Sequence, residues 1–106
     1  MDREVLKGHL DALLLAVLED GPAHGYAVIE RLRAKSEAAF VLPEGTVYPA
    51  LHRLEDGDLL SSRWVAHEGR QRRVYALTPA GRRALVRRRR EWGQFSAAVS
   101  RTLEPA

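Results

Sequence analysis

Four histidines are the side chains of this sequence best suited to metal binding or acid–base catalysis. They stand at positions 9, 24, 52 and 67, in a chain that contains no cysteine. Their spacing fits none of the metal-ligand patterns in which histidines and carboxylates share one helical face. No Ser–His–Asp set, phosphate-binding loop or pair of catalytic carboxylates is evident. The sequence therefore predicts a protein that is not an enzyme and that binds neither a metal nor a cofactor.

The arginines offer a different chemistry, which is the neutralisation of an anionic partner. Residues 1–60 hold six Lys/Arg against eleven Asp/Glu, whereas residues 61–101 hold eleven Arg against two Glu. The formal net charge of +3 conceals this asymmetry. A basic half indicates an anionic partner, most often nucleic acid, although a solvated arginine-rich helix would give the same counts.

Part of this positive charge belongs to a predicted β-hairpin. Residues 59–65 and 72–77 resemble strands, and the glycine-containing segment AHEGRQ separates them. Arg70, Arg72 and Arg73 lie in that loop and at the start of the second strand. We therefore expect a hairpin with a cationic tip, where the guanidinium groups can reach phosphates.

Apolar residues at helical spacing predict three helices before this hairpin. The stripe of the first helix consists of Leu10, Leu13, Leu14, Val17 and Leu18. Gly8 is expected as its N-cap. The second helix runs from about residue 24 to residue 35 and is expected to place Tyr26, Ile29 and Leu32 on one side.

The third helix, within EGTVYPALHRLEDGDLL, contains a proline where a helix should break. Pro49 is tolerable if the helix begins with Pro43 at its first position, because only one hydrogen bond is lost. It is also tolerable if Thr46 is the N-cap, since Pro49 then lies in the first turn. The helix must end near Gly57 or Asp58, one of which takes the left-handed cap.

Tyr48 lies away from the apolar stripe of this third helix. The stripe consists of Val47, Leu51 and Leu54, so Tyr48 and Pro49 point to another side. Aromatic side chains are usually buried, and a core position for Tyr48 is one interpretation. The alternative is that Tyr48 faces a ligand, where its hydroxyl can form a hydrogen bond and its ring can pack on an apolar group.

The segment TPAG opens a long last helix, with Thr78 as the N-cap and Pro79 at the first helical position. The helix can extend to about Leu103, which corresponds to a length of roughly 37 Å. Its apolar positions are Leu85, Trp92, Phe95, Val99 and Leu103. Residues 87–90 are all arginine and are expected to lie largely in solvent. This helix is longer than the core of a three-helix domain requires.

The length of 106 residues predicts one domain, or one domain with an appended element. A composition of 45% hydrophobic and 29% charged residues is typical of a globular protein. The longest apolar run, residues 12–18, is too short to cross a membrane. The N-terminal sequence does not resemble a signal peptide, so a cytoplasmic location is expected.

Three helices followed by a strand–loop–strand hairpin is the order of a winged helix-turn-helix. In detail the chain resembles the PadR family of bacterial transcriptional regulators. The distinctive matches are GPAHGY (21–26), GTVYPALHRLE (45–55) and RRVYALTPAG (72–81). The single terminal helix is similar to that of the short PadR subgroup, in which this helix forms the dimer. One departure is Asp58, which stands where family members usually have glycine.

The resemblance implies that the third helix is the recognition helix and that the hairpin is the wing. It places Tyr48 on the side that faces DNA. The expected DNA-binding residues are Thr46, Tyr48, Pro49, His52, Arg53, Arg70, Arg72 and Arg73. Because Arg53 and His52 are the few basic groups of the recognition helix, most phosphate neutralisation is expected from the wing and the N-terminal region.

Trp92 has three interpretations, as a core residue, a dimer residue or a platform for a ligand. The resemblance supports the third, because some members of the short subgroup bind planar aromatic compounds between the terminal helices of two subunits. The expected dimer and effector residues are Trp92, Phe95, Val99 and Leu103.

These observations predict a mainly α fold with a small β-hairpin. Residues 1–78 form a winged helix-turn-helix and residues 79–106 form a dimerisation helix. The expected function is that of a dimeric repressor that binds a pseudo-palindromic operator in double-stranded DNA and is released by a small effector. The alternative is a winged-helix adaptor that binds proteins and not DNA.

Overall fold

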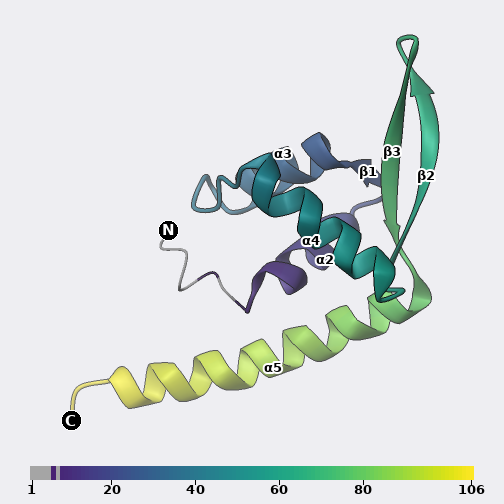
Figure 1. Ribbon diagram of the computed structural model, residues 1–106. Coiled ribbons are helices and arrows are strands. Elements are labelled where there is room, and N and C mark those ends of the chain that lie inside the picture. The colour runs from purple at the N-terminus through teal and green to yellow at the C-terminus, as the bar shows by residue number, and fades with distance from the viewer. Residues whose placement is uncertain (1–5, 7) are drawn as a thin grey trace.

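The computed structural model describes residue 6 and residues 8–106, which form four helices and a three-stranded antiparallel sheet (Figure 1). Residues 1–5 and 7, part of the expected N-terminal domain and of its expected phosphate-binding region, lie outside the described residues. In chain order the elements are α2 (Leu10–Leu18), β1 (Ala23–His24), α3 (Gly25–Lys35), α4 (Glu44–Asp56), β2 (Leu60–His67), β3 (Arg70–Leu77) and α5 (Pro79–Leu103).

The core lies where α2, α3 and α4 meet the base of the sheet. Side chains with almost no exposed surface include Leu14, Val28, Val47, Leu51 and Tyr75. The first turns of α5 contribute Ala84 and Leu85 to the same core. Beyond them α5 continues past the domain, as Figure 1 shows, and the molecule measures 61 × 27 × 20 Å. No described helix is both long and apolar enough to cross a membrane.

The hairpin formed by β2 and β3 is longer than the sequence pattern predicts. Its register runs from Leu60 opposite Leu77 to His67 opposite Arg70. The connection is a two-residue turn, Glu68–Gly69, with φ values of 50° and 75°. Two left-handed residues in succession are characteristic of the tight type I′ turn. The expectation of a six-residue loop, AHEGRQ, is therefore wrong.

Strand β1 was not expected from the sequence. It pairs with β3 through Ala23 opposite Tyr75 and His24 opposite Val74, which gives the strand order β1-β3-β2. Arg31 holds the preceding turn in place, because its guanidinium group donates to the carbonyl oxygens of Gly21 (2.6 Å) and Pro22 (3.3 Å).

The helix ends confirm one predicted cap and correct others. The amide of Gly81 donates to Oγ1 of Thr78 (2.9 Å), so Thr78 is the N-cap of α5 as predicted. The N-cap of α2 is His9 and not Gly8. Pro43 is the N-cap of α4, with extended backbone (ψ 159°), so both predicted starts of that helix are wrong.

At the other end of α4, Asp58 adopts the left-handed conformation (φ 63°) and Gly57 does not (φ −84°). The structure thus decides between the two predicted positions of the cap. In α3, Val28 is fully buried whereas Tyr26 is 57% exposed. Tyr26 does not lie on the buried side of α3 with Ile29 and Leu32, so the expectation that the three share one side is wrong.

Candidate nucleic-acid interface

Helix α4 has one face in the core and another in solvent. Its buried residues are Val47, Ala50, Leu51 and Leu54. Among the residues expected to bind DNA, Pro49, His52 and Arg53 are exposed, whereas Thr46 and Tyr48 are half-buried. Pro49 has no amide hydrogen to donate to the carbonyl oxygen of Gly45, so that hydrogen bond of the helix is missing. Gly45 is itself exposed to water. The proline is therefore accommodated on the solvent side of the helix.

The ring of Tyr48 rests on the first turn of α3. A Cβ atom added to Gly25 would lie 2.4 Å from Cε1 of Tyr48 and 2.7 Å from its hydroxyl oxygen. Glycine at position 25 therefore makes room for this ring. Tyr48 is half-buried, so it is neither a core residue nor a freely exposed one. Tyr26, the residue after Gly25, is exposed, and it was not among the residues expected to bind DNA.

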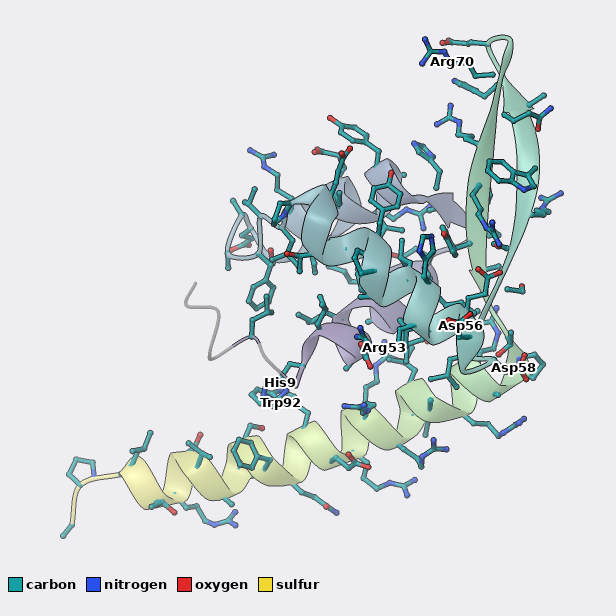
Figure 2. All side chains as sticks on the ribbon, viewed as in Figure 1. His9, Arg53, Asp56, Asp58, Arg70 and Trp92 are labelled. Atoms are coloured by element: carbon teal, nitrogen blue, oxygen red, sulfur yellow. The ribbon has the colours of Figure 1, made fainter. Side chains whose placement is uncertain are left out.

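Arg53 is engaged within the protein. Its Nη2 atom lies 2.6 Å from Oδ1 of Asp11 on α2. Figure 2 shows Arg53 on the side of α4 that faces α2, whereas Arg70 lies at the tip of the hairpin. The structure therefore does not bring Arg53 together with the wing arginines.

The last turn of α4 and the residues after it are acidic. Glu55 is partly buried, and Asp56 and Asp58 are exposed (Figure 2). An anionic partner would be repelled at this end of the helix. The N-terminal half, with Tyr48 and Pro49, is the part of α4 better suited to contact a polyanion.

The arginines of the hairpin divide between its two faces. Side chains alternate along a strand, and residues directly opposite each other share a face. Arg70 and Arg72 therefore lie on one face of the hairpin. The same face carries Val65, which is opposite Arg72, and Arg63, which is opposite Val74. Arg73 lies on the other face, opposite Trp64. Arg63 was not selected from the sequence, although the alternation of the strands could have identified it.

Arg72 contacts a histidine. Its Nη1 atom lies 2.7 Å from Nε2 of His24 in β1. Burial lowers the pKa of His24, and the neighbouring guanidinium group of Arg72 lowers it further. His24 is therefore kept neutral and can accept the hydrogen bond from Arg72. Among the described residues, no ion pair with a carboxylate involves Arg63, Arg70 or Arg72.

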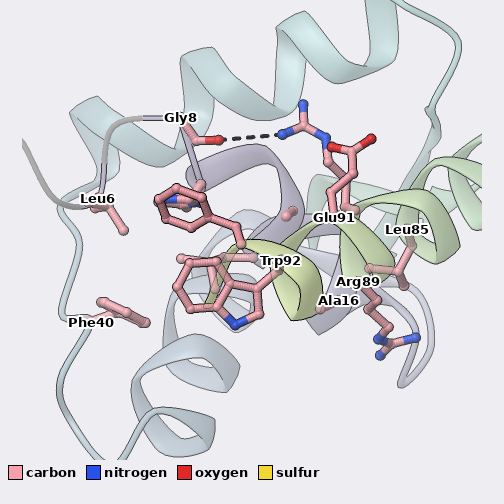
Figure 3. Close-up of a pocket in the computed structure, with 13 residues that line it drawn as sticks. Leu6, Gly8, Ala16, Phe40, Leu85, Arg89, Glu91 and Trp92 are labelled. Carbon is pink, nitrogen blue, oxygen red and sulfur yellow. Dashed lines mark hydrogen bonds between the residues drawn. The ribbon is translucent and has the colours of Figure 1, made fainter. Parts of the chain in front are cut away.

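A second feature of the structure is an apolar cleft of about 870 Å³ between α2 and α5 (Figure 3). Its walls include Leu13, Phe40, Leu85, Trp92 and Phe95. The rings of Trp92 and His9 make an edge-on contact, with their centroids 5.2 Å apart. The ring centroids of Trp92 and Phe95 are 6.0 Å apart.

Charged groups occupy the rim of this cleft. Arg89 forms two hydrogen bonds with Glu19 at the end of α2, at 2.7 and 3.0 Å. These bonds lower the pKa of the Glu19 carboxyl group. Arg88 donates to the carbonyl oxygen of Gly8 (3.4 Å), as drawn in Figure 3. The two arginines thus connect α5 to both ends of α2.

The expected dimer residues lie on the part of α5 that leaves the domain. Trp92, Phe95 and Leu103 are 53%, 58% and 77% exposed, and Val99 is half-buried. Trp92 is therefore not a core residue of the single chain. The described residues contain no cluster of three or more side chains able to hold a metal ion.

Comparison with known proteins agrees with this architecture. The model of the transcriptional regulator PadR-like family matches residues 14–87. The chain belongs to the PadR-like family. Its winged helix fold with a long C-terminal helix is that of PadR proteins, and the fold class predicted from the sequence is confirmed. The family consists of transcriptional regulators and not of enzymes.

Individual relatives align with nearly the whole chain. The transcriptional regulator Rv3488 of Mycobacterium tuberculosis is 40% identical over 97 residues, which span 92% of this chain and 88% of that protein. A transcriptional regulator from Clostridium thermocellum has a similar structure, with a TM-score of 0.87 at 27% identity, covering 95% of this chain and 99% of the other.

Bacillus subtilis PadR has been solved in complex with operator DNA. It aligns with a TM-score of 0.68 at 21% identity, over 74% of this chain and 44% of that chain. At this identity the likeness concerns the fold alone.

Proposed function

We propose that this PadR-like protein is a sequence-specific DNA-binding transcriptional regulator. Family membership supports regulation of transcription, and the operator complex of Bacillus subtilis PadR supports DNA as the partner. In this proposal the exposed side of α4 enters the major groove and the wing contacts the neighbouring backbone. The base-contacting residues are drawn from the N-terminal half of α4, with Tyr48, Pro49 and His52.

The observation that carries the proposal is the basic face of the wing. Arg63, Arg70 and Arg72 share this face and have no carboxylate partner among the described residues. A guanidinium group without an internal counterion is available to bind a phosphate. Such a contact neutralises the phosphate and releases cations bound to the DNA. The alternative, a winged-helix adaptor for proteins, gives no reason for concentrating arginines there.

Selection of bound sequences from a random DNA pool tests the proposal directly. We expect an enriched pseudo-palindromic sequence, and retardation of that DNA should persist in excess nonspecific competitor. A variant with Arg63, Arg70 and Arg72 all replaced by alanine is the matched control and should lose most of the binding. Recovery of no enriched sequence would favour the adaptor.

The finer part of the proposal concerns assembly. We propose that residues 1–78 form the DNA-binding domain and that residues 79–106 form the dimerisation helix. The exposed apolar residues of α5 support this division, because monomers rarely expose such a continuous surface. A two-fold dimer predicts half-sites spaced by about 34–36 Å along the DNA or a multiple of that distance.

The proposed regulation is release of a repressor by a small planar aromatic compound. The cleft lined by Trp92, Phe95 and His9 supports such a ligand, because stacking and desolvation favour aromatic rings there. A ligand releases DNA only if it prefers a dimer geometry that misplaces the two recognition helices.

Titration with a panel of planar aromatic dyes, followed by tryptophan emission, tests the ligand site. Quenching is expected in the wild type and should be lost in Trp92→Ala, which retains Trp64 as an internal reference. Quenching that persists in Trp92→Ala would remove the proposed site.

A further inference from the structure

We infer that Arg73 is a positioning residue that fixes the angle between the wing and the recognition helix, and that it does not contact phosphate. This inference rests on the proposed DNA-binding function. It also revises the expectation that Arg70, Arg72 and Arg73 act alike.

Strand geometry separates Arg73 from the other wing arginines. Arg73 is opposite Trp64, whereas Arg72 is opposite Val65. The face that carries Arg73 also carries Tyr75 and Leu77, which are buried against the core. Arg73 thus lies on the side of the hairpin that faces α4.

The guanidinium group of Arg73 is held by three neighbours. Its Nε atom donates to Oγ of Ser62 on β2 (2.7 Å), and Nη2 lies 3.3 Å from Oε1 of Glu55 on α4. The Ser62 hydroxyl donates in turn to Oε2 of Glu55. The group also lies over the ring of Trp64, with Cζ 5.5 Å from the ring centroid.

This arrangement connects three elements. Glu55 belongs to the recognition helix, Ser62 and Trp64 to β2, and Arg73 to β3. The chain passes from α4 to β2 through residues 57–59 alone. A network that fixes both strands to α4 beyond this short connection limits how far the wing can swing.

The partners of Arg73 also oppose a role in phosphate binding. Glu55 is only 23% exposed at its side chain, so its charge would be left poorly solvated if Arg73 turned toward DNA. Arg70 has no such partner among the described residues and lies at the tip of the wing (Figure 2). The two arginines therefore make opposite predictions.

The experiment compares Arg73→Ala with Arg70→Ala as the matched control, on a selected operator over a range of salt concentrations. Arg70→Ala should reduce the slope of log affinity against log salt by about 0.9, the value for one phosphate contact. Arg73→Ala should leave the slope unchanged and weaken operator binding about fivefold to tenfold, within the range of coupling between contacting residues. A slope reduced by about 0.9 in Arg73→Ala would overturn the inference.

Two further variants should change the DNA affinity in ways that a phosphate contact by Arg73 cannot explain. Arg73→Lys keeps the charge but loses the fork that reaches both Ser62 and Glu55, so it should weaken binding nearly as much as Arg73→Ala. The effect of Glu55→Gln on binding should be smaller in the Arg73→Ala background than in the wild type, because the two side chains act through one network. If Arg73 contacted phosphate, Arg73→Lys would bind almost normally.

Hydrogen exchange in the DNA-free protein separates this inference from the proposed function. Arg73→Ala and Glu55→Gln should raise the exchange rates of wing amides in residues 63–72 about fivefold and leave those of α2 unchanged. Arg70→Ala should change neither set. Unchanged wing exchange in Arg73→Ala would overturn the inference, whereas failure of the wild type to bind any DNA would count only against the proposed function.

Discussion

The chemical environment of each side chain decides which of the basic residues can act on a partner. Arg53 and Arg73 are both engaged with carboxylates of the same chain, at 2.6 and 3.3 Å. Arg72 instead donates to a histidine that is kept neutral, and no carboxylate of the described residues forms an ion pair with it. Charge counting treats these arginines as equals, whereas their partners make them different.

For Arg72 we predict a salt-dependent and largely sequence-independent contribution to binding. Arg72→Ala should reduce the slope of log affinity against log salt by about 0.9, because one phosphate contact is lost. Specific and nonspecific DNA should be affected to a similar extent. Arg101→Ala, near the far end of α5, is the control and should leave the slope unchanged. If Arg63→Ala, Arg70→Ala and Arg72→Ala all have the wild-type slope, the wing is not part of the interface.

Tyr48 and Gly25 make a second prediction at this scale. Gly25→Ala should destabilise the wild type by about 1–3 kcal/mol, because its Cβ atom would meet the Tyr48 ring. In a Tyr48→Ala background the same change should be neutral or stabilising, since alanine is then free to favour the helix. Urea denaturation of the four proteins measures the coupling. An equal cost in both backgrounds would mean that Tyr48 does not rest on Gly25.

DNA binding by the same Tyr48 variant addresses its function. Tyr48→Ala should reduce specific binding by about 1–3 kcal/mol, with a much smaller effect on nonspecific binding. Retardation of operator and random DNA by the folded variant measures both. If the two affinities fall equally, Tyr48 reads no base.

At the scale of elements, the end of α4 departs from ordinary capping. The left-handed position after this helix is held by Asp58, whereas the glycine at position 57 has an ordinary negative φ. A residue with a Cβ atom costs about 1 kcal/mol more than glycine in the left-handed region. Asp58→Gly should therefore raise stability by about 1 kcal/mol, which thermal or urea unfolding can detect. Gly57→Ala is the control and should change stability by less than about 0.5 kcal/mol.

The helices could be predicted from the sequence because their determinants are local. Thr78 and Pro79 specify the start of α5, and apolar spacing specifies α2. Strand β1 could not be predicted, since it has two residues without a period and depends on pairing with Val74 of a distant strand. The strands of the outer part of the hairpin, residues 66–71, could not be predicted either. Neither face of this part is buried, so no hydrophobic alternation marks it.

The candidate site was predictable to the level of elements but not of contacts. The sequence identified α4 and the wing as the candidate DNA-binding surfaces, and phosphate contact by Arg70 and Arg72 stays a prediction. It could not show that Glu55 holds Arg73 or that Asp11 holds Arg53, because each pair joins different elements. Such partners are set by tertiary packing.

At the scale of the whole molecule, α5 serves two purposes along its length. Its first turns are part of the core, where Gly81 and Leu85 are buried. A Cβ atom at Gly81 would lie 2.1 Å from the carbonyl oxygen of Leu59, so this approach needs glycine. The remainder of the helix projects from the domain, where Trp92 and Phe95 are exposed and line the cleft. In the proposed dimer, a second copy of the chain buries this half-covered apolar surface.

Deletion of residues 91–106 tests whether the projecting part of α5 holds a dimer. The truncated protein should be monomeric or prone to aggregation, because the walls of the cleft lose Trp92 and Phe95 while Leu13 and Leu85 stay in place. Phe95→Asp, a single change on the exposed surface, should also give monomers without loss of the folded domain. Analytical ultracentrifugation measures the mass, and operator retardation should weaken in parallel because one half-site is no longer bound by a linked partner. A stable dimer in both variants would place the subunit contact elsewhere in the molecule.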